Sequence, residues 1–311
     1  MTRLAEYKKE RLDKLAAASA DTGGVSLWGD ALRRLSRNPV AIIGAVIVGL
    51  FILLAIFAPL LTGHDPYARQ LIEVRANSGE IPGPQPGFPL GVDQEGRDFL
   101  ARLIIASRQT LLVGVFATLI GLAIGTVIGS LAGAFGGWVD TLAMRFVDIM
   151  LAIPSLLLAI SLVAMVQHPN QWTIIIAVAI VQTPIFARLL RGTMLAQRES
   201  DHVLAARALG VRRHSIVLRH MLPNAMSPVI VQATLALATS ILDAAALSFL
   251  GLGDPNPDRA EWGLMLAQAQ RFLDASKILA IWPAVAIILV ALGFTLLGES
   301  MREAIDPKNR R

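Results

Sequence analysis

The sequence contains no cysteine among its 311 residues, which excludes disulfide bonds, thiol nucleophiles and cysteine-ligated iron–sulfur clusters. No glycine–lysine pair occurs, so the chain has no Gly-x-x-x-x-Gly-Lys loop to hold a nucleotide phosphate. Its five histidines are scattered along the chain, and no two of them have the spacing of a metal site. No Ser/His/Asp arrangement stands out. We therefore predict that this chain is not an enzyme and holds no cofactor or metal.

Charged residues are also scarce. Asp, Glu, Lys and Arg make up 16% of the chain, whereas 54% of the residues are hydrophobic and the mean hydropathy is +0.59. The apolar residues come in long runs, which a soluble domain of this length rarely carries. We predict an all-α polytopic membrane protein.

Six apolar runs are long enough to cross a bilayer as helices. Pro154 lies in the middle of the third run, and we expect Pro184 to kink the fourth. The predicted spans are 40–62, 110–135, 140–166, 172–190, 224–250 and 279–297.

Polar segments between these runs divide the chain into five parts. The first is a charged tail with an amphipathic piece near residues 27–35, and the core includes a polar loop at 191–222. The parts in order are a tail at 1–39, a first span at 40–62, a Pro- and Gly-rich loop at 63–105, a five-helix core at 106–300 and a tail at 301–311.

The placement of charge indicates an orientation. Lys and Arg outnumber Asp and Glu by eight to five in the first tail, seven to two in residues 188–222 and four to three from residue 299 onward. In the loop at 63–105 the acidic residues are in excess, with four Lys and Arg against six Asp and Glu. The loop at 250–280 likewise has three basic against four acidic residues. Because basic segments stay on the cytoplasmic side, we predict that both termini and the 191–222 loop are cytoplasmic.

Residues 200–223 form a polar island that we name the elbow. Ser200 suits a helix N-cap, Asp201 suits the positive end of the helix dipole, and Gly210 suits the left-handed position past a helix end. We expect a second short helix at about 211–222 and Pro223 in the first turn of the next one. Such an elbow on the basic side of a membrane protein is suited to docking into a groove of a soluble partner.

A stripe of glycines runs along the second predicted span at every fourth residue. In lipid there is little hydrophobic drive between helices, so small residues that let two backbones approach supply the packing. We predict a tight helix–helix seam at Gly121, Gly125, Gly129 and Gly133.

Three ionisable residues lie inside the predicted spans. Arg145 and Asp148 are three residues apart, where opposite charges can neutralise each other, and a structural or interface role suits them. Asp243 lies within apolar sequence, where an unpaired acid is costly. It either serves a solute pathway or is a protonated or Ser/Thr-bonded acid at a subunit interface, with Ser240 three residues away.

The elbow resembles the EAA loop of permease subunits of binding-protein-dependent, ATP-driven (ABC) importers. Ala205-Ala206, Gly210 and Leu222-Pro223 occupy the matching positions. The family's glutamate is Leu204 here, and its apolar residue two places before Leu-Pro is His220. The departure at Leu204 removes one candidate ion pair with the ATPase.

Other strings resemble the dipeptide, oligopeptide and nickel branch of this family. The pattern Leu-Gly-x-Asp-x-x-Gly-Arg-Asp at 90–98 is similar to the sequence that precedes the second span in that branch. Residues 248–253, 261–266 and the Asp306-Pro307 ending also match. The resemblance runs from about residue 32 to 306 and is strongest to the second permease of the pair.

The resemblance implies a MetI-like fold in a bacterial inner membrane. It implies a related permease, two ATPase subunits that hold ATP and Mg²⁺, and an extracytoplasmic solute-binding protein as partners, with no nucleic acid. The outer loops at 63–105 and 252–278 would then meet the binding protein. The implied ATPase contact comprises Leu204, Ala205, Ala206, Arg207, Ala208, Leu209, Gly210, Arg212, Arg213, Leu222 and Pro223.

The solute implied by the resemblance is a dipeptide or oligopeptide, with nickel or another small solute as the alternative. Two other classes remain open at this point: a secondary carrier and a membrane scaffold that transports nothing. A proton-coupled carrier usually needs more ionisable groups within its spans than this chain has, which weakens the carrier alternative.

Overall fold

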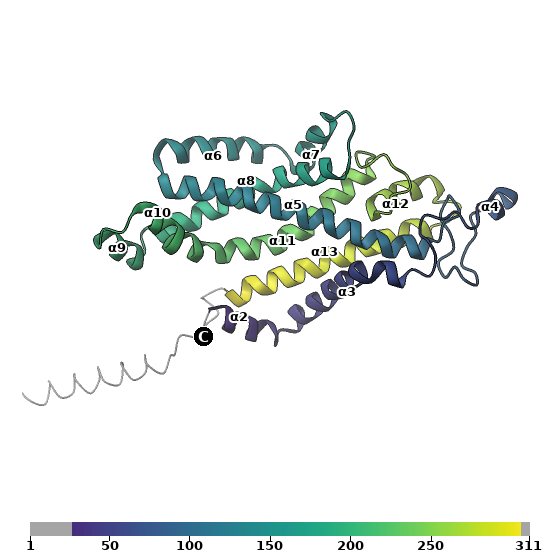
Figure 1. Ribbon diagram of the computed structural model, residues 1–311, viewed down its shortest axis with the longest axis horizontal. Coiled ribbons are helices and arrows are strands. Elements are labelled where there is room, and N and C mark those ends of the chain that lie inside the picture. Colours follow the sequence, from purple (N-terminus) through teal and green to yellow (C-terminus); the bar gives the residue numbers. More distant parts are fainter. Residues whose placement is uncertain (1–26, 306–311) are drawn as a thin grey trace, which may run out of the picture.

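The computed structural model describes residues 27–305, and helices are the regular secondary structure throughout that range (Figure 1). Residues 1–26 of the predicted tail at 1–39 and the Asp306-Pro307 ending lie outside the described residues. The helices are α2 (Leu27–Leu35), α3 (Pro39–Leu61), α4 (Ile72–Ser78), α5 (Phe99–Phe135), α6 (Gly137–Ala152), α7 (Ser155–Ala164), α8 (Gln171–Arg198), α9 (Asp201–Ala208), α10 (Arg213–Ser215), the π-helical segment η1 (Ile216–Met221), α11 (Leu222–Phe249), α12 (Trp262–Ala269), the 3₁₀ turn η2 (Gln270–Phe272) and α13 (Ile278–Ile305).

Polar side chains fix where the long helices begin. Asn38 accepts a hydrogen bond from the Val40 amide, and Pro39 occupies the first turn of α3, where its missing N–H costs nothing. Asn170 and Thr173 form a reciprocal capping box at the start of α8. These caps satisfy backbone amides that have no partner within the helix.

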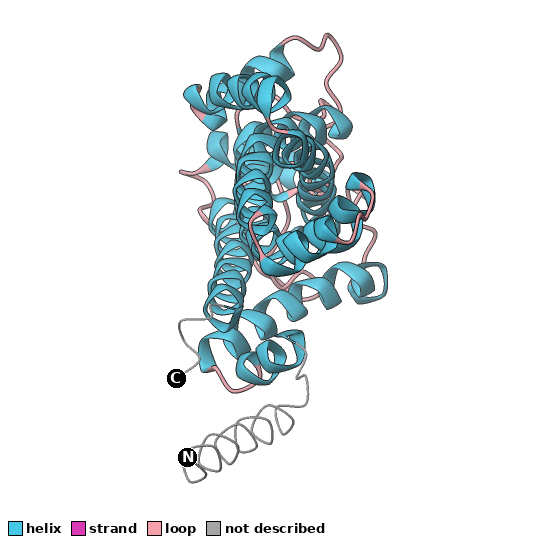
Figure 2. Cartoon of the chain, turned by 90° about the vertical axis from the view of Figure 1, so that its left-hand side faces the viewer, coloured by secondary structure: helices cyan, strands magenta, loops and turns pink. Residues whose placement is uncertain are grey.

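The long helices form one bundle. α5 packs along α8, α11 contacts both, and α13 lies on α11. α3 runs beside α13 and α5, while α6 packs on α5 and α8 and α7 packs on α8, on the side of the bundle away from α3 (Figures 1 and 2). We name the end with α9, α10 and the last turn of α13 the elbow end, and the end with α4, α12 and their loops the loop end.

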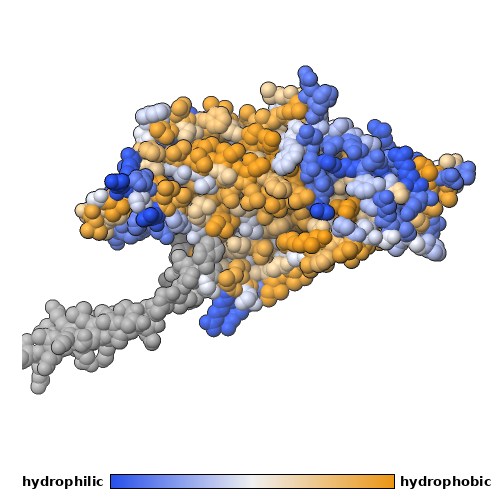
Figure 3. Space-filling model, in the orientation of Figure 1, coloured by the Kyte–Doolittle hydropathy of each residue, from blue (hydrophilic) through white to orange (hydrophobic). Residues whose placement is uncertain are grey.

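An apolar band covers the middle of the bundle between two polar ends (Figure 3). Five helices are long and apolar enough to cross a membrane: α3, α5, α8, the continuous helix Arg213–Phe249 and α13. The pair α6 and α7 makes a sixth span if the two are counted together. The structure therefore supports five or six spans on one polytopic scaffold.

The glycine stripe of α5 lies against α8. A Cβ on Gly125 would come within 2.5 Å of the Phe186 Cβ, and one on Gly129 within 2.5 Å of the Ala187 carbonyl oxygen. Gly121 and Gly133 are similarly close to α8. The two backbones therefore approach more closely than any side chain on the stripe would permit.

The third predicted span is not one straight helix. α6 ends at Ala152, Ile153 is extended, and α7 starts after Pro154 at an angle of 94° to α6. Proline disfavours a helical residue before it and clashes with the preceding turn, so the helix breaks here. The predicted span at 140–166 therefore consists of two helices that meet at a sharp bend beside Pro154. Pro184, by contrast, lies inside the unbroken α-helix α8.

Two helices extend beyond their predicted bounds at the polar ends. α5 begins at Phe99 rather than near residue 110, because the Asp98 side chain accepts hydrogen bonds from the Leu100 and Ala101 amides. The loop expected at 63–105 therefore ends at Asp98. α8 continues to Arg198, beyond the predicted end of its span at residue 190.

Candidate functional site

The first half of the elbow is a short helix with one packed and one open face. Val203 and Ala206 are buried against the bundle. Leu204 and Arg207 face outward, and Leu209, just past the helix end, is 82% exposed. An exposed leucine beside buried small residues leaves an apolar knob on the surface of the elbow.

Gly210 ends α9 in a left-handed conformation with φ of +73°. The Gly210 amide donates to the Arg207 carbonyl and the Val211 amide to the Ala206 carbonyl, which is a Schellman motif. A Cβ at this position would meet no atom within 4 Å, so the backbone conformation alone favours glycine. Ser200 precedes α9 but does not cap it, because its hydroxyl donates to the Gln197 carbonyl instead.

The second half of the elbow continues directly into the fifth span. The separate helix expected at 211–222 is replaced by one turn, α10, and the π-helical segment η1, after which α11 follows without a break. Pro223 lies in the first turn of α11 and lacks the amide hydrogen that an interior helix residue donates. The wider π turn, in which the Leu222 amide donates to the Val217 carbonyl, lies just before this proline.

Arg213 ties the elbow to the end of α5. Its Nη2 donates to the carbonyl oxygens of Ala134 (2.7 Å) and Phe135 (3.2 Å), which have no partner within the helix. The guanidinium also lies 5.1 Å from the centre of the Phe135 ring. The side chains of Arg207 and Arg212, by contrast, are exposed and make no polar contact with the described residues.

The structure brings the residues expected to contact an ATPase to one end of the bundle, with differing exposure. Ala206 is buried and Leu222 is half-buried. The exposed members are Leu204, Ala205, Arg207, Ala208, Leu209, Gly210, Arg212, Arg213 and Pro223.

The charged residues of the third span have other partners than expected. Asp148 pairs with Arg188 of α8, and Arg145 is exposed with no partner among the described residues. Asp140 pairs with Arg191, an interaction that the sequence did not suggest. The predicted Arg145–Asp148 pair was wrong because α6 presents its acids toward α8, where two arginines are available.

Asp243 is half-buried and has no hydrogen-bond partner among the described residues. The Ser240 hydroxyl is instead bonded to Thr118 of α5, with the two oxygens 3.0 Å apart. The alternative in which Ser240 holds the acid therefore does not describe this structure. A role in a pathway or at an interface stays a prediction.

At the loop end, a buried ionic network joins segments that are far apart in sequence. Asp93 accepts from the Arg97 Nε (2.7 Å) and lies 3.2 Å from the Arg102 Nε, and all three side chains are nearly fully buried. The Arg97 Nη1 also donates to Asp258 (2.7 Å), in the loop before α12. Arg102 donates to backbone carbonyls of that loop, including that of Asp258 (3.2 Å).

Glu261, at the start of α12, is a second buried acid at the loop end. The Ser248 hydroxyl donates to its Oε1 (2.8 Å). Burial raises the pKa of Glu261 to about 7, against the opposing effects of the Ser248 hydrogen bond and nearby Arg259. Gly263, two residues after Glu261, packs on the Ala245 backbone. Because glycine has no side chain, α12 packs closely against α11 at this point.

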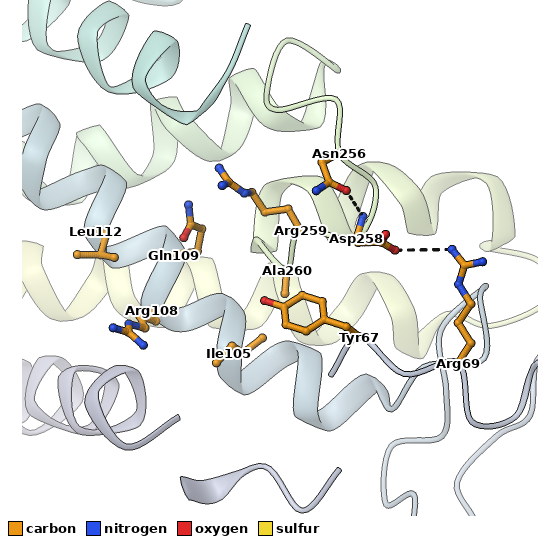
Figure 4. Close-up of a pocket in the computed structure, with 10 residues that line it drawn as sticks. All are labelled: Tyr67, Arg69, Ile105, Arg108, Gln109, Leu112, Asn256, Asp258, Arg259 and Ala260. Carbon is orange, nitrogen blue, oxygen red and sulfur yellow. Dashed lines mark hydrogen bonds and ion pairs between the residues drawn. The ribbon is translucent and has the colours of Figure 1, made fainter. Parts of the chain in front are cut away.

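A cavity of about 750 Å³ opens beside this network, between α5, the loop after α3 and the loop before α12 (Figure 4). Its walls combine three arginines with amide, hydroxyl and apolar groups. The lining residues are Tyr67, Arg69, Ile105, Arg108, Gln109, Leu112, Asn256, Asp258, Arg259 and Ala260.

Sequence reasoning missed both the network and the cavity. The signal for the network was the density of charge in the 90–98 string, which holds Asp93, Glu95, Arg97 and Asp98 within nine residues. Nothing in the sequence linked that string to Asp258. Among residues 27–305, no group of three or more His, Cys, Asp or Glu side chains is arranged to hold a metal ion.

Two family descriptions match the chain. The N-terminal transmembrane domain of oligopeptide transport permease C matches residues 26–78, and the binding-protein-dependent transport system inner membrane component matches residues 125–311. Among solved structures, an inward-facing MetNI methionine ABC transporter shares the fold over 66% of this chain and 96% of its own, with a TM-score of 0.54 and 19% identity.

Three curated relatives are similar over almost their whole length. The chain is 44% identical to the dipeptide transport system permease protein DppC of Alkalihalophilus pseudofirmus, over 91% of each. It is 39% identical to the glutathione transport system permease protein GsiD of Pectobacterium atrosepticum, over 90% of this chain and 91% of that one. It is 38% identical to the probable D,D-dipeptide transport system permease protein DdpC of Escherichia coli, over 88% of this chain and 89% of that one. The chain belongs to the family of inner membrane components of binding-protein-dependent transport systems.

Proposed function

We propose that this permease subunit forms half of the pathway through which an ATP-driven importer takes up dipeptides or oligopeptides. The relatives that support this solute class are a dipeptide, a glutathione and a probable D,D-dipeptide permease, all of which act on short peptides by name. In this proposal the energy for transport comes from separate ATPase subunits.

The single observation that carries the coupling proposal is the exposed apolar knob at the elbow end. Leu209 is 82% exposed on a short helix whose other face is buried and anchored, and unpaired Arg207 and Arg212 flank it. A leucine this exposed at a polar end is suited to a pocket on another subunit. In our proposal the elbow docks into one of the importer's two ATPase subunits, and the elbow end faces the cytoplasm.

The loop end then faces outward, where the solute-binding protein delivers its cargo. A related permease completes the pathway alongside this chain, and two ATPases bind below the pair. ATP-driven closure of the ATPases moves the two elbows, and the spans rock as rigid bodies between inward- and outward-facing states. Selectivity for one peptide over another is set mainly by the binding protein.

The test replaces Leu209 with Asp in the importer purified with its partner permease and ATPases. A buried carboxylate in the docking pocket would be costly, so ATPase subunits are expected to dissociate in detergent and solute-stimulated ATP hydrolysis to fall by at least about tenfold. The measurements are co-purification of the ATPases and hydrolysis stimulated by the loaded binding protein. Ala206 is a poor probe, because it is buried and its replacement would disturb the fold.

Leu273→Asp is the matched control, because Leu273 is an exposed leucine (43%) at the opposite end of the bundle. This variant should keep its ATPases bound. Full stimulation in Leu209→Asp would remove the docking assignment. Peptide uptake into vesicles that lack the ATPases would instead identify a secondary carrier, and uptake of nickel but no peptide would overturn the solute class.

A further inference from the structure

The cavity at the loop end has an excess of positive charge. Three of its lining residues are arginines and one is an aspartate. Two of the arginines are already neutralised: Arg69 lies 2.7 Å from Glu95, and Arg259 lies 3.0 Å from Asp254. The third, Arg108, is exposed and makes no ion pair or hydrogen bond with the described residues.

A second unpaired donor lies next to Arg108. The Nε2 of Gln109 is buried and has no hydrogen-bond partner among the described residues. A buried amide without an acceptor loses the hydrogen bonds it makes in water, so a ligand that supplied an acceptor would be favoured. Figure 4 shows Arg108 and Gln109 projecting in different directions from successive positions of α5, with Gln109 on the side of Arg259.

The walls of this cavity are held in place by buried ionic groups. Arg97 and Arg102 are fully buried in the network with Asp93, and Arg102 donates to the carbonyls of Asp258 and Arg259. These bonds fix the loop before α12 against α5. The cavity is therefore a preformed site, with Arg108 as its free cation and Ile105 and Leu112 as its apolar side.

We propose that this cavity binds the carboxylate of a transported peptide, with Arg108 as the charge partner and Gln109 as a hydrogen-bond donor. A guanidinium and an amide N–H together match the acceptors of a carboxylate. A volume of about 750 Å³ suits a small molecule. The inference rests on the proposed function, because the peptide is the solute that such an importer carries.

The first experiment measures the charge preference of the cavity without transport. Since the chain has no native cysteine, Ile105→Cys places a single thiol in the wall, one helical turn from Arg108. The assembled importer is treated with a sulfonate-bearing or a trimethylammonium-bearing methanethiosulfonate, and labelling is followed by the mass of this chain. One nearby positive charge should favour the anionic reagent by about fivefold or more.

Arg108→Gln in the Ile105→Cys background should abolish that preference. Arg271→Gln is the matched control, because Arg271 is an exposed arginine of the loop end that does not line the cavity. An unchanged preference in Arg108→Gln, or an equal loss in Arg271→Gln, would overturn the assignment of Arg108.

The second experiment identifies the ligand. A dipeptide delivered by the binding protein should slow labelling of Ile105→Cys at least about threefold, and its C-terminal amide should not. Equal protection by the amide would exclude carboxylate recognition. Protection that depends on phosphatidylglycerol in the surrounding bilayer, and not on peptide, would assign the cavity to a lipid headgroup and overturn the proposal. If no peptide is taken up but the anion preference persists, the proposed solute class fails while the anionic site stands.

Discussion

The two polar ends of the bundle satisfy their charged groups in different ways. At the loop end, Arg97 and Arg102 are fully buried and share Asp93, and Arg97 also reaches Asp258 across the bundle. At the elbow end, Arg207 and Arg212 are exposed and unpaired within the described residues.

This difference separates an end where Arg97 and Arg102 are buried and ion-paired within the chain from an end where Arg207 and Arg212 are exposed and unpaired among the described residues. Because removing one partner of a buried ion pair is costly, the loop-end contacts hold these two side chains in place. The elbow presents Leu209 and free arginines that contribute little to the folded state of this chain. We infer that the elbow is shaped for another subunit and the loop end for positioning a cavity.

The largest expected effect comes from breaking the loop-end network. Asp93→Asn would leave Arg97 and Arg102 buried without their shared counter-charge, and removing one partner of a buried pair costs about 3–5 kcal/mol. The free energy of unfolding, measured in detergent, should fall by that amount. Arg69→Gln, at the half-exposed rim of the same network, should change it by less than about 1 kcal/mol. Similar small losses in both variants would show that the network does not stabilise this end.

A smaller effect concerns Glu261 and pH. Its pKa rises from the ordinary 4.5 to about 7 in the folded protein. Between these values the unfolded chain loses the proton while the folded chain keeps it, so the contribution of Glu261 to stability is greatest below pH 4.5 and falls as the pH rises through 7. The full loss is about 3 kcal/mol.

Thermal melts of the purified permease across this pH range would measure the slope. Glu261→Gln should flatten it, since the amide does not titrate. Glu80→Gln, which changes an exposed glutamate at the same end, should leave the slope unchanged. Wild-type and Glu261→Gln curves of equal slope would contradict the assignment of this titration to Glu261.

The smallest expected effect on stability is at the elbow. Leu209→Ala removes an exposed side chain that packs on little in this chain, so the free energy of unfolding should change by no more than about 0.5 kcal/mol. The same chemical unfolding assay measures it. A loss above about 1.5 kcal/mol would show that Leu209 packs within the subunit, and the contrast between the two ends would disappear.

Composition and charge alone predicted the membrane class and the all-α fold, and both were confirmed together with the family. Those features depend on local patterns, because a long apolar run must form a helix in lipid wherever it packs. The left-handed conformation of Gly210 was also predicted from the sequence, because the residue just past a helix end favours glycine whatever its neighbours.

The features that the sequence did not reveal depend on contacts between distant segments. Asp148 pairs with Arg188 rather than with Arg145, because the rotation of α6 against α8 decides which arginine is near. The same holds for the pairing of Arg97 with Asp258, which are 161 residues apart in the chain. The spacing of residues along one helix predicts neither of these two ion pairs, because each joins separate segments of the chain.

The absence of a break between the elbow and the fifth span has a mechanical consequence. Residues Arg213–Phe249 form one continuous helix of 37 residues, about 55 Å long. Its far tip carries Ser248, the partner of Glu261. Tilting such a rod by about 10° around its midpoint displaces each tip by roughly 5 Å. Under the proposed function, this one continuous backbone would carry a movement of the elbow, the proposed ATPase contact, directly to the loop end.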